Sequence, residues 1–88
     1  MATWDDAKRR ENLVRHGLDL TDADEFDFIT ALVEEDRDEQ GEQRFRAIGW
    51  LRGRLVFLVY TLRDDDEVHA ISLRRCTRKE ARRYADEI

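Results

Sequence analysis

Five arginines fall within the ten residues 74–83, where a predicted strand ends and a predicted helix begins. They are Arg74, Arg75, Arg78, Arg82 and Arg83. A guanidinium group is planar and binds phosphate or carboxylate with two parallel hydrogen bonds. We therefore expect an anion-binding site here. The anion is RNA, a partner protein or the acidic remainder of this chain.

RNA supplies its own nucleophile, the 2′-OH, so a metal-free ribonuclease needs only a base, an acid and cationic stabilisation. The candidate proton carriers are Glu80, His16, His69 and Tyr84. Each also has a structural interpretation: capping for Glu80 and His16, packing on a sheet for Tyr84, and an ordinary strand position for His69. The residues alone therefore indicate an anion-binding domain and no more.

Hydrophobic periodicity predicts the elements that carry these residues. Asp5 or Thr3 is expected to cap a helix that runs to about Arg15 and ends at Gly17. Its apolar stripe would place the helix on a sheet, and it comprises Trp4, Ala7, Val14 and Leu18. A short second helix would begin at Asp19 or Thr21 and carry Ala23 and Phe26.

Strands are predicted from Ala31, over Gln43–Trp50, over Leu55–Tyr60 and from Val68. The apolar run Leu55–Tyr60 is typical of a central strand covered on both faces. The run Glu34–Glu42 is predicted to be a solvated acidic loop, and Asp64–Asp66 a hairpin connection. Thr77-x-x-Glu80 has the form of a capping box that opens a C-terminal helix.

These elements predict an α+β fold in one domain, residues 1–88, with N-terminal helices, an antiparallel sheet of about four strands and a C-terminal helix. If the last two strands pair, Arg63 and Arg74 lie at opposite ends of the hairpin. Curvature or a neighbouring helix would then have to bring them together.

Charge is distributed unevenly along the 88 residues, whose net charge is −5. Residues 19–42 hold eleven acids and one base, whereas residues 43–88 hold seven acids and eleven bases. Of the 16 basic residues 14 are arginines, a bias that hints at phosphate or carboxylate recognition. No signal peptide or membrane span is evident, so a cytoplasmic protein is expected. Cys76 and two histidines match no zinc-site spacing, and we expect no metal.

The sequence resembles the family of BrnT-type toxins along essentially the full chain, with the matching residues in the same order. The N-terminal matches are Trp4-Asp5, Lys8, Asn12 and His16-Gly17. The central matches are Glu42-x-Arg44, Ile48-Gly49, Gly53-Arg54, Val59-Tyr60-Thr61 and Arg63. The C-terminal matches are Ile71-Ser72-x-Arg74-Arg75-x-Thr77-x-x-Glu80 and Tyr84.

The resemblance implies a RelE-like fold and toxic cleavage of RNA without metal or organic cofactor. It also implies neutralisation by a BrnA-type antitoxin, in a higher-order complex that represses their shared operon. The implied catalytic residues are Arg63, Arg74 and Glu80. The implied RNA-contacting or supporting residues are Lys8, His16, Arg54, Arg75 and Tyr84. His69, Leu73 and Cys76 depart from the family pattern, and His69 replaces an arginine.

Two alternatives stay open beside a ribonuclease toxin. The first is a non-catalytic family member that only binds an antitoxin, and the second is a metal-dependent nuclease. The last is disfavoured because neither Lys8 nor Lys79 has a glutamate two residues before it.

Overall fold

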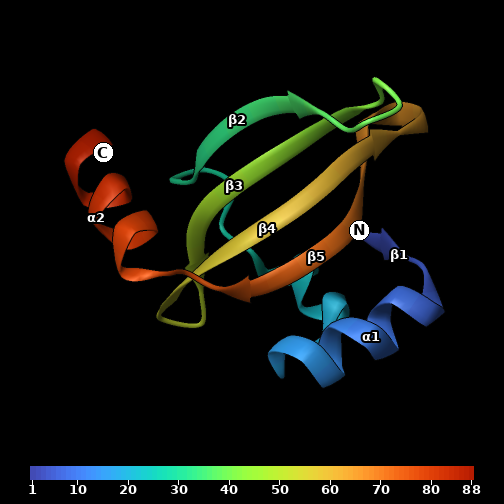
Figure 1. The fold of residues 1–88 in the computed structure, drawn as a ribbon, viewed down its shortest axis with the longest axis horizontal. Helices are drawn as coiled ribbons and strands as arrows, with labels where there is room; N and C mark the ends of the chain where they lie inside the picture. Colours follow the sequence, from blue (N-terminus) through green and yellow to red (C-terminus); the bar gives the residue numbers. More distant parts are fainter.

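The computed structural model describes all 88 residues, with the exception of the side chain of Asp65. The elements are β1 (Thr3–Trp4), α1 (Asp6–His16), the 3-10 helix η1 (Leu20–Glu25), β2 (Leu32–Arg37), β3 (Gln43–Leu51), β4 (Arg54–Arg63), the 3-10 helix η2 (Asp64–Asp66), β5 (Glu67–Arg75) and α2 (Arg78–Glu87). In Figure 1 the strands β2 to β5 form one twisted sheet, with α1 beside β5 and α2 at the far end.

The sheet has five strands in the order β1-β5-β4-β3-β2. Strands β2 to β5 pair antiparallel with their chain neighbours, as the sequence predicts. The first strand was not predicted: Thr3 and Trp4 pair parallel with His69 and Ala70 of β5. The expected sheet of about four antiparallel strands is therefore a mixed sheet of five. Two residues are too few to show an alternating pattern, which is why β1 escaped detection.

Helix α1 begins and ends where its capping residues indicate, but it buries a different side chain. The Asp5 carboxylate accepts from the backbone N–H groups of Ala7 and Lys8, and Gly17 ends the helix in the left-handed conformation at φ 70°. The predicted apolar stripe is wrong, because Val14 is 87% exposed whereas Asn12 is only 4% exposed.

Asn12 attaches α1 to the edge of the sheet. Its side-chain oxygen accepts from the backbone N–H of Leu73 at 3.0 Å, and its amide nitrogen donates to the Leu73 carbonyl at 2.8 Å. The same nitrogen donates to the Leu18 carbonyl at 2.8 Å. One amide side chain thus takes the place of a neighbouring strand at the point where β1 no longer covers β5.

About half of the acidic run that was predicted to be a loop belongs to a strand. Residues Leu32–Arg37 form β2, in register with β3 so that Glu34 lies opposite Arg46 and Asp36 opposite Arg44. Cross-strand pairs of opposite charge stabilise a sheet even where strand propensity is low. The predicted loop is therefore reduced to the turn at residues 38–42.

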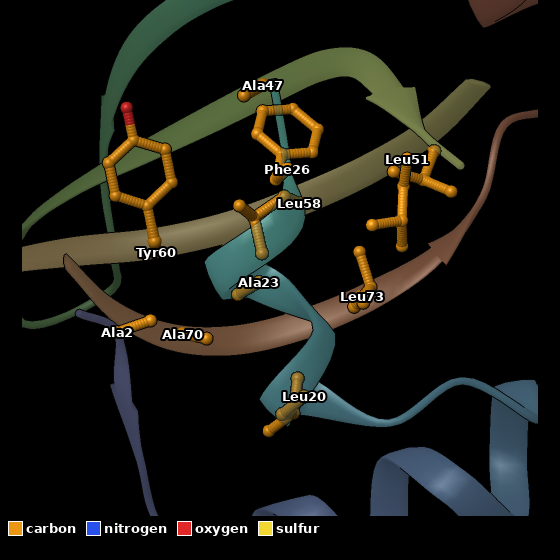
Figure 2. Close-up of a cluster of buried hydrophobic side chains, with 11 residues drawn as sticks. Ala2, Leu20, Ala23, Phe26, Ala47, Leu51, Leu58, Tyr60, Ala70 and Leu73 are labelled. Atoms are coloured by element: carbon orange, nitrogen blue, oxygen red, sulfur yellow. The ribbon is translucent and has the colours of Figure 1, made fainter. Parts of the chain in front are cut away.

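The core lies on one face of the sheet, under η1 (Figure 2). Phe26 packs so closely on β3 that a Cβ at Gly49 would lie 2.6 Å from its ring, so this position requires glycine. On β4, Val56 and Leu58 are buried on the core face, while Phe57 on the other face is only half-buried. The expected covering of β4 on both faces is therefore wrong. We call the face of Phe57 the open face.

None of the helices among the described residues is long and apolar enough to cross a membrane.

Candidate functional site

Helix α2 is held at one end of the sheet by a capping box and a buried tyrosine. The Thr77 hydroxyl accepts from the Glu80 backbone N–H at 3.2 Å, and the Glu80 carboxylate accepts from the Thr77 N–H at 2.9 Å. This confirms the predicted cap. Tyr84 donates its O–H to the Thr30 carbonyl at 2.9 Å and packs edge-on against Trp50. The cap thus places Glu80 beside the last residues of β5.

Arg74 is the most firmly held guanidinium of the cluster. Its two terminal nitrogens donate to the two carboxylate oxygens of Glu80, each at 2.8 Å, and one of them also donates to the Arg75 carbonyl. The guanidinium lies 4.3 Å from the centroid of the Phe57 ring, in cation–π geometry. Both contacts fix the plane of the group before any ligand binds.

The same ion pair determines the protonation of Glu80. Hydrogen bonds from Arg74 lower the pKa of Glu80 against the opposing effect of burial, and the Thr77 N–H adds to the shift. The pKa of Arg74 is raised in turn, mainly by Glu80. Glu80 is therefore ionised at neutral pH, a state suited to orienting Arg74 rather than to donating a proton.

Arg74 and Glu80 line a cleft of about 240 Å³ between α2 and the open face. Its floor is apolar, formed by Leu32, Ile48 and Phe57, and its rim also includes Arg46, Arg83 and Glu34. Sequence reasoning treated Arg83 as part of a solvated helix face. Its spacing of three residues from Glu80, which places both on one side of a helix, was the available signal.

Lys8 and His16 line a second hollow, where α1 borders β5. Ser72 lines it too, and lies two residues before Arg74 on the same strand and face. Two strand residues span about 7 Å. The α1 hollow, at the edge of β5, is therefore separated from Arg74 by about two strand residues.

Other predicted residues lie elsewhere. Arg63 pairs with Glu67 while Arg74 pairs with Phe57, six positions away along β4. That separation corresponds to about 20 Å, so the structure does not bring Arg63 to the cleft. Arg75 pairs with Val56 and so faces the core side, the opposite face from Arg74.

Arg54 and Arg75 meet on that opposite face. They line a separate hollow of about 310 Å³ with Leu18, Leu51 and Val56. The predicted phosphate-binding pair of adjacent arginines is therefore divided between the two faces of the sheet.

His69 is buried, whereas Cys76 is half-buried. His69 is 8% exposed, and its Nδ1 lies 2.8 Å from the Thr3 hydroxyl oxygen in a hydrogen bond. Burial and the charge of Arg63 lower the pKa of His69, so the ring is neutral at pH 7. Burial raises the pKa of the Cys76 thiol to about 11. Among the described side chains, no group of three or more His, Cys, Asp or Glu is arranged to hold a metal ion.

An α+β fold with a fixed arginine in a cleft defines a small domain able to bind anions. Residues 4–80 match the family described as "Ribonuclease toxin, BrnT, of type II toxin-antitoxin system". The chain belongs to this BrnT family. It is also similar to the solved structure of the Brucella abortus ribonuclease toxin, BrnT, with 27% identity and a TM-score of 0.71. The match covers 89% of this chain and 99% of that one. No curated protein sequence matches.

Proposed function

We propose that the chain is the toxin of a type II toxin–antitoxin system, an endoribonuclease that cleaves RNA in the cytoplasm without a metal ion. The observation that supports it best is Arg74, a guanidinium fixed by Glu80 and Phe57 in a cleft of the open face. RelE-like ancestry, which the resemblance implies, stays a prediction.

The proposed reaction is attack of the RNA 2′-oxygen on the adjacent phosphorus. A P–O bond forms to the 2′-oxygen, and the bond from phosphorus to the 5′-oxygen breaks. Arg74 stabilises the negative charge that develops on the phosphorane oxygens, and Glu80 holds Arg74 in the required plane. Histidine gives and takes protons near neutral pH, and His16 lies in the neighbouring hollow. We assign His16 the removal of the 2′-OH proton, and water gives the departing 5′-oxygen its proton, so that the products end in a 2′,3′-cyclic phosphate and a 5′-hydroxyl.

We propose different roles for the other residues that the sequence predicts at the site. Lys8 binds a phosphate beside His16, and Arg63 binds one further along the open face. Tyr84 supports the cleft by fixing α2, because its hydroxyl is bonded to Thr30. Arg54 and Arg75 face the other side of the sheet and bind no part of the scissile phosphate.

The proposed partner is a BrnA-type antitoxin that inhibits the enzyme within a higher-order complex, and this complex represses the operon. An acidic segment of the partner would neutralise the arginines of the open face. Charge complementarity of this kind favours rapid association and specificity.

Purified protein incubated with single-stranded RNA, in EDTA or in Mg²⁺, tests the proposal. We expect cleavage that survives EDTA. Cleavage only in Mg²⁺ would support a metal-dependent nuclease instead. Intact RNA under both conditions, together with binding to an antitoxin, would support a non-catalytic binding module.

The Arg74–Glu80 pair also predicts a dependence of stability on pH. Because the pKa of Glu80 is lower in the folded state, its contribution is fully present above the unfolded value near 4.5 and disappears as pH falls through the folded value. Thermal unfolding followed between pH 7 and pH 3 should therefore show a smaller acid-induced loss of stability in Glu80→Gln than in the wild type. Glutamine keeps the cap, so the two proteins are comparable. Parallel losses would show that the pair adds nothing to stability.

A further inference from the structure

A row of arginines continues from the Arg74 cleft along β3. Arg44 and Arg46 lie on the open face, since Arg46 pairs with Val59 and paired residues share a face. Arg46 lines the Arg74 cleft and also a second groove of about 470 Å³, which Arg44 and Val59 line as well. Arg46 borders both, so the two hollows lie on either side of this side chain, and we call the two together the path.

Each arginine of this path already faces a carboxylate from the neighbouring acidic edge. Arg46 lies 3.3 Å from Asp36, and Arg44 lies 3.3 Å from Asp38. Arg83, at the cleft, is paired with Glu34. Glu34 and Asp36 are alternate residues of β2, about 7 Å apart, and Asp38 follows in the turn after the strand. A row of carboxylates therefore lies alongside a row of guanidinium groups.

We propose that Arg44 and Arg46 bind successive phosphates of a single RNA strand that runs along β3 into the Arg74 cleft. The carboxylates of β2 and its turn hold these arginines until the phosphates displace them. This inference rests on RNA being the substrate, as proposed above. It adds a binding track outside the reacting centre and assigns it to two arginines for which the sequence indicated no functional role.

The exposure of the Arg46–Asp36 pair makes such an exchange feasible there, whereas the Asp38 side chain beside Arg44 is only 9% exposed. The side chains of Arg46 and Asp36 are 47% and 49% exposed, so water screens their attraction and the pair is weak. A phosphate carries the same charge and acceptor oxygens as the carboxylate that it replaces, and binds guanidinium with the same bidentate geometry.

A single RNA strand fits this path better than a folded protein does. The charges form a line, as the phosphates of a single strand do, and Phe57 and Val59 provide half-buried apolar contacts between the arginines. Cationic grooves with aromatic side chains are the usual means of holding single-stranded nucleic acid.

The first test uses a 12-nucleotide RNA that is 2′-O-methylated throughout, because it lacks the nucleophile and stays intact. Its affinity is measured by fluorescence anisotropy at several KCl concentrations. Removing two phosphate contacts in the double variant Arg44→Gln, Arg46→Gln should reduce the slope of log K against log[salt] by about 1.4. The double variant Arg44→Lys, Arg46→Lys, which keeps both charges, should keep most of the slope. An unchanged slope in the glutamine variant overturns the track.

The second test compares two variants, each of which lacks one carboxylate of β2: one on the open face and one on the opposite face. Asp36→Asn should bind the oligonucleotide about fivefold more tightly, the effect of one unit charge at about 4 Å in water. Glu35→Gln is the control, since it changes the net charge equally but lies opposite Phe45 and bonds to Gln43. Equal effects of the two substitutions would show a general charge effect and overturn the exchange.

The outcomes for the track and for the proposed function are separable. If ordinary RNA is cleaved but the slope does not change in the glutamine variant, the function stands and the track is wrong. If ordinary RNA is not cleaved but the slope falls, the track stands and the ribonuclease assignment is wrong. If a polyglutamate peptide binds through Arg44 and Arg46 and the oligonucleotide does not, the row is a protein-docking surface and the RNA track is overturned.

Discussion

Substitution of Arg74 by alanine is expected to reduce RNA cleavage by about 100- to 1,000-fold, the usual effect of removing one preorganised group that stabilises developing charge. The variant should also lose growth inhibition when it is expressed in bacteria. The reason is the geometry of the side chain, which Glu80 and Phe57 hold at the cleft before RNA binds. Initial rates on a labelled RNA, with folding checked by circular dichroism, measure the effect.

Arg75 provides a matched control for this prediction. It is the next residue of the same strand and carries the same charge, but it faces the other side of the sheet with Arg54. Arg75→Ala should therefore retain most of the activity. Arg74→Lys should behave like the alanine variant, because lysine keeps the charge but loses the bidentate geometry. Full activity in Arg74→Ala would show that the reacting centre lies elsewhere.

Asn12→Leu is expected to cause a large loss of stability. Leucine has a similar shape but leaves the backbone N–H and carbonyl of Leu73 and the carbonyl of Leu18 without their partner. Each unpaired buried group costs about 1–3 kcal/mol, so a total near 3 kcal/mol is a conservative expectation. For a domain of this size the melting temperature should fall by roughly 12–24 °C.

Val14→Ala, on the same helix, is the control for Asn12→Leu. Val14 is 87% exposed, so its substitution should change the melting temperature by only a few degrees. The hydrophobic pattern of the sequence predicts instead that Val14 lies on the buried stripe of the helix, and this stripe does not include Asn12. A larger loss from Val14→Ala than from Asn12→Leu would contradict the described attachment of α1 to β5.

The local signals in the sequence were the reliable ones. Capping at Asp5, Gly17 and Thr77 depends on residues three or four positions apart, and all three caps are confirmed. The α+β class is confirmed for the same reason, since β3, β4 and β5 each carry their own alternation or apolar run. Membership of the BrnT family, predicted from the ordered matches, is confirmed as well.

Features that depend on distant partners were not predictable in the same way. β1 exists only because β5 offers it hydrogen bonds. The strand predicted from Ala31 is confirmed as β2, but its extension from Glu34 to Arg37 depends on the arginines of β3 that lie opposite its acids. The two faces of β5 separate Arg74 from Arg75, which the sequence alone had grouped as one phosphate site. The expected distance between Arg63 and Arg74 was correct, but no curvature or helix brings them together.

The central claim is that this chain cleaves RNA with the 2′-OH as nucleophile and Arg74 as the stabilising charge. The most direct measurement is mass spectrometry of the products formed in EDTA from a short RNA and from the same RNA 2′-O-methylated at every position. The account predicts products of the unmodified RNA that end in a 2′,3′-cyclic phosphate and a 5′-hydroxyl, with the methylated RNA left intact. Cleavage of the methylated RNA, or no cleavage of either, would contradict it.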